Sequence, residues 1–131
     1  MAKSALVDMQ QAVIQYLRNS IGVLNVGDSF PQDNNLTHFV HLKDATVADI
    51  SNKYNKRSRV SFTFHVISED TTMFLEMLDA VQSLATTNAL ILEAHNIDNT
   101  NITMFNTFVD TQVEKQTRNG VITIEFDITQ I

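Results

Sequence analysis

The sequence predicts an α+β fold, in which a mainly antiparallel β-sheet packs against two helices in the chain order α-β-β-α-β-β-β. Three observations support this fold class. Residues 57–85 change from the period of a strand to that of a helix, residues 4–20 keep a helical period, and residues 121–131 alternate as a strand does. No internal repeat, low-complexity tract or linker interrupts the sequence, so we assign all 131 residues to one domain, 1–131.

The stretch 57–85, RSRVSFTFHVISEDTTMFLEMLDAVQSLA, is the central unit of the chain. Its first half alternates apolar and polar residues, which predicts a strand with one buried face. Its second half repeats apolar residues every three or four positions, which predicts a helix with one buried face. Ser68 and Asp70 offer side-chain oxygens for the helix N-cap. The expected core residues are Val60, Phe62, Phe64 and Val66 on the strand, and Phe74, Leu78, Val81 and Ala85 on the helix.

The N-terminal helix is expected from Ser4 to Ser20, with Ser4 as N-cap and Gly22 just beyond its end. Its apolar face packs on the core or docks on a partner chain, and the core is the favoured alternative. Polar residues, Asp8 among them, cover the opposite side of this helix. Residues 22–35 are rich in Asn, Asp, Gly, Ser and Pro, which predicts a loop. Residues 36–42, LTHFVHL, predict a short strand that is covered on both sides.

Residues 43–57 show weak periodicity and carry a basic run, Lys53, Lys56 and Arg57, followed by Arg59 in the next strand. Two structures remain open for this stretch. It is a mobile loop that a partner orders, or it extends two strands into a protruding hairpin. The basic residues either contact an acidic surface or nucleic acid, or they simply keep the hairpin soluble.

The region after the central helix predicts three further strands. A strand is expected over 89–95, a turn over the polar stretch NIDNTN at 96–101, and a strand over 102–114. Phe105 and Phe108 break the alternation of this last strand, which predicts a bulge or an irregular start.

Asn119-Gly120 is the strongest local turn signal, because both residue types accept the positive φ of a type I′ hairpin turn. The closing strand 121–131 follows it, with Ile122, Ile124, Phe126 and Ile128 on one face. A two-residue turn at this position would place Val113 opposite Phe126, Thr111 opposite Ile128, and Glu114 opposite Glu125.

The composition is that of an ordinary globular protein, with 44% hydrophobic and 18% charged residues. The net charge of −6 argues against broad nucleic-acid affinity, which depends on neutralising phosphates. The chain has no Cys, which excludes disulfides, a Cys nucleophile and thiolate metal sites. We expect no signal peptide and no membrane span, and therefore a cytoplasmic site of synthesis.

No arrangement of residues predicts catalysis. His38 and His41 are three apart, which places them on opposite faces of a strand, and no HExxH or Cys ligand accompanies them. Glu125 and Asp127 share a strand face, but acids on a terminal strand commonly discourage aggregation. Phosphate-binding loops and nucleophile motifs are also missing from the sequence. We therefore expect no enzyme activity, no cofactor and no metal site.

The remaining prediction is assembly, because an open sheet edge pairs readily with another chain and closes a ring in a symmetric oligomer. The N-terminal helix, the segment RSRVSFTFHVISED leading into MFLEMLDAVQSLA, and the closing NGVITIEFDITQI resemble the tail terminator or tail-to-head joining (tail completion) proteins of long-tailed bacteriophages. The resemblance covers nearly the whole chain and consists of patterned positions.

The resemblance implies a virion structural protein that forms a hexameric ring at the end of the tail tube. Its partners would be other copies of itself, the tail tube protein and the head-completion or connector protein. DNA would pass through the lumen without sequence-specific binding, no membrane would be involved, and the protein would be assembled in the host cytoplasm. The candidate contact residues are Lys53, Lys56, Arg57 and Arg59 in the stretch 43–59, with Asp28 and Asp33 in the loop 22–35.

The alternative hypothesis is a small ligand-binding or regulatory module. Such a module would act as a dimer and would bind its ligand in an apolar pocket between helix and sheet.

Overall fold

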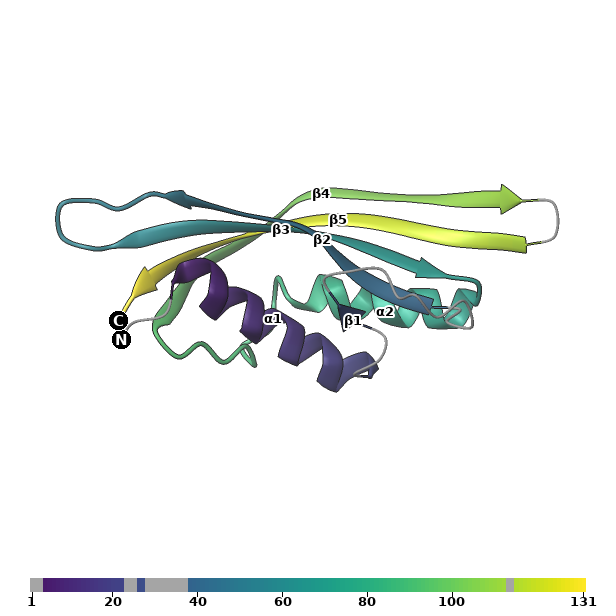
Figure 1. Cartoon of the computed structure of the whole chain (residues 1–131), viewed down its shortest axis with the longest axis horizontal. Coiled ribbons are helices and arrows are strands. Elements are labelled where there is room, and N and C mark those ends of the chain that lie inside the picture. The colour runs from purple at the N-terminus through teal and green to yellow at the C-terminus, as the bar shows by residue number, and fades with distance from the viewer. Residues whose placement is uncertain (1–3, 23–25, 28–37, 113–114) are drawn as a thin grey trace.

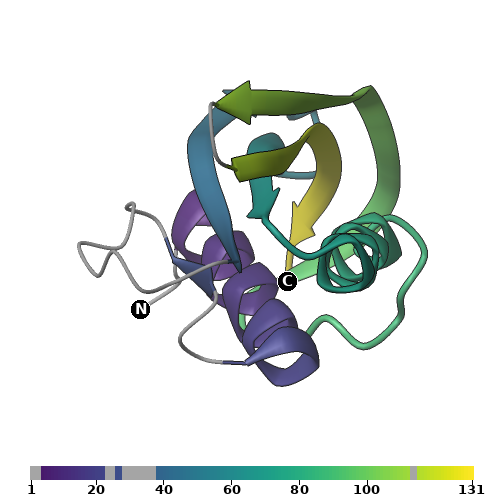
Figure 2. The ribbon, with the colours of Figure 1, turned by 90° about the vertical axis from the view of Figure 1, so that its right-hand side faces the viewer.

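The computed structural model describes residues 4–22, 26–27, 38–112 and 115–131, and for 110–112 and 115–116 it describes the backbone alone. The described chain is a five-stranded sheet with two helices on one of its faces (Figures 1 and 2). The elements are α1 (Ala5–Ile21), β1 (Val26–Gly27), β2 (His38–Asp49), β3 (Arg57–Ser68), α2 (Thr71–Ser83), β4 (His95–Gln112) and β5 (Lys115–Gln130). The predicted α+β fold class is confirmed.

The sheet has the strand order β1-β2-β3-β5-β4. The short strand β1 pairs in parallel with β2, and the other neighbouring strands are antiparallel. The hairpins β2–β3 and β4–β5 project from opposite ends of the molecule (Figure 1). Two long hairpins therefore lie side by side in one sheet, joined through the pair β3 and β5.

Both helices begin at the residues that the sequence indicates. The Ser4 hydroxyl accepts a hydrogen bond from the backbone N–H of Val7 at the start of α1. The Asp70 carboxylate accepts one from the N–H of Met73 at the start of α2. Gly22 follows α1 with a φ of 103°, a conformation that glycine adopts without strain.

The core lies between the helices and the inward face of β3 and β5. Phe62 packs between Phe64 and Phe126, with ring centroids 6.1 Å apart in each pair. Burying each of these side chains contributes roughly 1.5–3 kcal/mol to the free energy of unfolding. The fully buried residues of this face are Val60, Phe62, Phe64 and Val66 on β3, and Ile122, Ile124, Phe126 and Ile128 on β5.

The basic stretch 43–57 forms the protruding hairpin, which was one of the two alternatives left open by the sequence. β2 extends to Asp49, well beyond the expected end at residue 42, and β3 begins at Arg57. The connecting loop comprises residues 50–56 only. Residues 36 and 37, where the first strand was expected to begin, lie outside the described residues.

The strand expected over 89–95 is wrong, and so is the turn expected over 96–101. Residues 89–94 are irregular, and His95 begins β4, which continues through Asn96–Asn101. Leu90 and Leu92 alternate because they pack on the core from one side. The polar residues 96–101 tolerate a strand because β4 is an edge strand, where side chains remain in contact with water. The observed order is therefore α-β-β-β-α-β-β.

The turn predicted at Asn119-Gly120 is also wrong, since both residues lie inside β5. Gln112 of β4 pairs with Lys115 of β5, and the two residues between them lie outside the described residues. As a result Phe126 lies opposite Thr100, Ile128 opposite Ile97, and Glu125 opposite Asn101, which removes the unfavourable pair of glutamates. The expected irregularity near Phe105 is present as a register shift between Ile102 and Met104.

Gly120 lies at a close contact with α2 rather than in a turn. A Cβ atom at this position would lie 2.9 Å from Leu78 Cδ1 and 3.4 Å from Phe74 Cζ, both on α2. The missing side chain allows α2 to approach β5 closely.

Replacing Gly120 with Val should destabilise the protein by about 1–3 kcal/mol, because the added carbons overlap Leu78 and force α2 away from the sheet. Urea denaturation followed by circular dichroism measures this change. Thr107→Val is the matched control, since Thr107 pairs with Gly120 but is exposed, and it should shift the free energy by less than about 0.5 kcal/mol. A Gly120→Val variant as stable as the parent would contradict the packing role.

Candidate interaction surfaces

The face of the sheet that carries no helix bears mostly polar side chains on β3 and β5. On β3 and β5 every second residue is buried against the helices, which turns the residues between them to the opposite face. Thr63 and Thr123 share a hydrogen bond of 3.0 Å across this face, and His65 Nε2 lies 2.9 Å from Asn119 Oδ1. We call this surface the bare face of the sheet.

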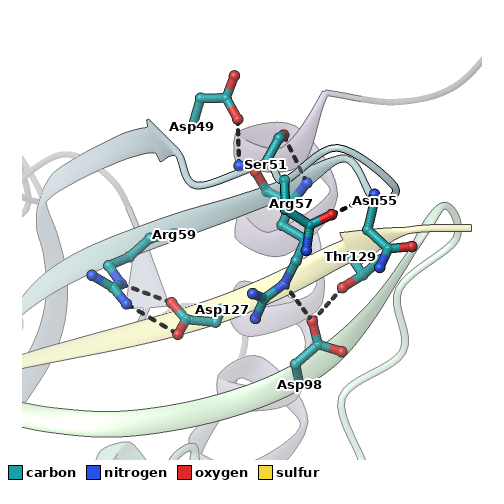
Figure 3. Close-up of polar contacts among 9 residues, drawn as sticks. Asp49, Ser51, Asn55, Arg57, Arg59, Asp98, Asp127 and Thr129 are labelled. Atoms are coloured by element: carbon teal, nitrogen blue, oxygen red, sulfur yellow. Dashed lines mark hydrogen bonds and ion pairs between the residues drawn. The ribbon is translucent and has the colours of Figure 1, made fainter.

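An arginine–aspartate pair joins β3 and β5 on the bare face (Figure 3). Arg59 donates to both carboxylate oxygens of Asp127, over 2.8 and 3.2 Å, and Glu125 lies 3.9 Å from the same guanidinium. These hydrogen bonds and charges lower the pKa of the Asp127 carboxyl and raise that of Arg59. Arg59 is thus held by its own chain in a bidentate pair.

A second cluster joins three strands nearer the C-terminal end of β5 (Figure 3). Arg57 of β3 lies 3.4 Å from an oxygen of Asp98 on β4, and Thr129 of β5 donates a hydrogen bond to that oxygen. Asp98 falls in the stretch that the sequence assigned to a turn, so its pairing with Arg57 was not foreseen. The arginines of the basic run therefore neutralise acids of the bare face.

The lysines of the basic run remain at the tip of the β2–β3 hairpin. Lys53 and Lys56 are exposed, and the Lys53 ammonium lies 5.9 Å from the ring centroid of Tyr54, which is 84% exposed. Hydrogen bonds from backbone to side chain stabilise the shape of this tip. The Asp49 carboxylate accepts one from the Ser51 N–H, and the Asn52 side-chain oxygen accepts two from the N–H groups of residues 54 and 55. The structure thus separates the predicted contact residues into a tip pair and a bare-face pair. Asp28 and Asp33 lie outside the described residues.

Large apolar side chains are exposed on β4. Met104, Phe105, Phe108 and Val109 are each 43–49% exposed, although aromatic side chains in a monomer are commonly covered. The sequence pointed to Phe105 and Phe108 only as breaks in an alternating pattern. The four exposed residues point alternately to the two faces of β4, so apolar side chains are exposed on both faces of this edge strand.

A buried acid attaches α1 to the beginning of β4. The Asp8 carboxylate is 2% exposed and accepts hydrogen bonds from the N–H groups of Glu93 and Ala94 and from the ring of His95, over 2.8–2.9 Å. Burial raises the pKa of the Asp8 carboxyl, but these three donors favour its charged form more strongly and lower the pKa overall. The sequence placed Asp8 on the solvent side of the helix, which is wrong.

A hollow with a volume of about 680 Å³ lies between residues 85–92 and the start of β4. Its lining includes several polar side chains, among them Thr86, Thr87 and Asn96. Within the described ranges, no three His, Cys, Asp or Glu side chains are grouped closely enough to hold a metal ion. The helices that the structure describes are also too short or too polar to cross a membrane.

Comparison with solved structures finds this fold in a chain of the "virion of native gene transfer agent (GTA) particle". The match has a TM-score of 0.70 and 18% sequence identity, and it covers 97% of this chain and 99% of that chain. Comparison by sequence finds no matching family model and no matching curated protein. The likeness shows that the two chains share one fold over their whole lengths.

Replacing Asp8 with Asn should destabilise the protein by about 1–3 kcal/mol at neutral pH, because the amide group cannot accept all three hydrogen bonds and leaves buried donors without partners. Urea denaturation measures the loss. The matched control is Asp79→Asn on the exposed side of α2, which should change the free energy of unfolding by less than about 0.5 kcal/mol. Equal effects of the two substitutions would contradict the role of Asp8.

The contribution of Asp8 should also depend on pH. Its pKa is lower in the folded chain than the value of about 3.9 expected for the unfolded chain. The stabilisation is therefore complete above the unfolded pKa and is lost as the pH falls through the folded pKa. The difference in urea midpoint between the parent and Asp8→Asn should narrow as the pH falls below about 4. A difference that widens there would contradict this assignment.

Proposed function

We propose that this protein is a virion structural protein that ends the tail tube of a phage-like particle and joins the tail to the head connector. The observation that supports this most directly is the match along the full length of both chains to a component of a gene transfer agent virion. The elements that carry the sequence resemblance, α1, β3–α2 and β5, form the core of this same fold. The structural match depends on the backbone fold, whereas the resemblance depends on the pattern of residues in the sequence.

In the proposed function the protein forms a homo-oligomeric ring of six copies, and DNA passes through its lumen. The charge distribution is compatible with passage of a polyanion. The net charge is −6, and both Arg57 and Arg59 are paired with acids on the bare face instead of being available to phosphates. DNA is therefore expected to meet a surface that does not retain it.

The tip of the β2–β3 hairpin is a contact site in this proposal. It projects from one end of the molecule (Figure 1) and carries Lys53, Tyr54 and Lys56, all exposed. Its internal hydrogen bonds hold it in one shape, which lowers the entropy lost on docking. An adjoining virion protein with an acidic surface is the partner that this tip fits.

The alternative function is a small ligand-binding or regulatory dimer, and the hollow between residues 85–92 and β4 is the observation that favours it. The hollow lies at the side of the sheet, whereas the space between helices and sheet is filled by the core. The expected apolar pocket between helix and sheet is therefore occupied by side chains of the described core.

The mass of the native particle separates the two functions. Static light scattering of the purified protein, alone and with tail tubes from particles that lack it, should reveal a six-copy ring or tight binding to tube ends. A dimer of fixed mass that ignores the tubes would overturn the virion proposal and favour the ligand-binding alternative.

The two groups of basic residues should have different effects on assembly. Lys53→Ser with Lys56→Ser removes charge from the free tip, so it should weaken head–tail joining in a complementation assay and leave the urea midpoint unchanged. Arg57→Ser with Arg59→Ser removes the partners of Asp98 and Asp127, so it should also lower the urea midpoint. Normal joining by the lysine variant would show that the tip is ordinary solvent-exposed chain.

A further inference from the structure

The outer edge of β4 is open along its length in the part of the chain that the structure describes. β4 ends the strand order and pairs with β5 on one side only. Natural edge strands are commonly protected by Lys, Pro or β-bulges. β4 contains no Lys or Pro in its 18 residues, HNIDNTNITMFNTFVDTQ, and its two register shifts, at Ile97/Asn99 and Ile102/Met104, leave Asn99–Ile102 regularly paired between them. Its backbone N–H and C=O groups on the outer side are thus available to another strand.

A second open edge lies on the opposite side of the sheet. β1 pairs only with Val40 and His41 of β2, so no described strand covers β2 from Leu42 to Asp49. This part of β2 also exposes an apolar side chain, since Val47 is 50% exposed.

The two open edges lie at the same level along the strands. The pairing places Thr46, Ser61, Glu125 and Asn101 in one row across the sheet. The next row in the same sense is Ala48, Arg59, Asp127 and Asn99. Three successive antiparallel pairings also make β2 and β4 run in opposite directions. A second copy that lies beside the first in the same orientation therefore presents its β2 edge antiparallel to the β4 edge of the first copy.

We propose that the β4 edge of one copy pairs with the β2 edge, Leu42–Asp49, of a second copy of this chain. Because the contact uses two different edges, it is heterologous, and every added copy again presents one edge of each kind. Such a contact closes into a ring when its rotation divides a full turn. It would form the subunit contact of the ring proposed above, and in that respect it rests on the proposed function.

Cysteine cross-linking tests this pairing directly, because the parent chain has no Cys. Thr46 and Asn101 are exposed and lie in the same row at opposite edges. The double variant Thr46→Cys/Asn101→Cys, treated with a short bifunctional thiol reagent, should give a ladder of multimers. An equal mixture of the two single variants should stop at dimers, and each single variant alone should stay uncross-linked.

The second row provides a repeat of the test, with the double variant Ala48→Cys/Asn99→Cys. Thr72→Cys/Asn101→Cys is the matched control, since Thr72 is also exposed but lies on α2, and it should give no ladder. Dimers from Asn101→Cys alone would show that β4 pairs with β4, which overturns the proposal. Failure of both edge pairs to cross-link, with and without tail tubes, would also overturn it.

A charge variant gives an independent readout. Asn99→Lys/Asn101→Lys adds the protection that β4 lacks, so it should weaken self-association by about tenfold and leave the fold intact. The exposed Thr72→Lys variant is the control and should not change association. Cross-linking without tube binding would uphold the edge contact and reject the tail role. Tube binding by rings that do not cross-link would reject the edge contact alone.

Discussion

The burial of one face of the strand pair β3 and β5 is the constraint on which the rest of the structure depends. The inward residues of both strands are fully buried beneath the helices, and their aromatic rings pack against one another. Since side chains alternate along a strand, this burial assigns the remaining residues to the bare face, where polar groups can be hydrated. It also makes β3 and β5 central, so β2 and β4 have to supply the exposed edges.

Two local contacts then place the helices on this strand pair. Gly120 lets α2 lie close to β5, because a side chain there would occupy the space of Leu78. Asp8 joins α1 to residues 93–95, where the irregular segment ends and β4 begins. The charged form of Asp8 is stable in the interior only because three donors surround it. Both contacts are small, yet each positions a whole element.

Local patterns in the sequence predict the features that depend on a single helix or strand, such as its buried face and its cap. The alternation of Val60 to Val66 and the N-caps at Ser4 and Asp70 were therefore read correctly. The turn prediction at Asn119-Gly120 is wrong because Gly120 packs closely against α2, an element that is distant in the sequence. The polar stretch around Asp98 predicts a turn, whereas the strand observed there is stabilised by pairing with β5 and by the contact of Asp98 with Arg57, neither of which is visible in the local sequence. Asp8, on the polar side of a helix pattern, gave no signal of its partners 85–87 residues away.

The energetics of the two kinds of surface favour assembly through edges rather than through the bare face. Arg57 and Arg59 of the bare face already have acidic partners in their own chain, so a subunit docking there would have to desolvate ion pairs that gain little from a new neighbour. The outer backbone groups of β4 have no strand partner in the described chain. Pairing them with another strand exchanges hydrogen bonds to water for hydrogen bonds to protein and also covers exposed side chains such as Met104 and Val47. Joining copies at their edges would therefore leave the bare face, with its neutralised arginines, uncovered.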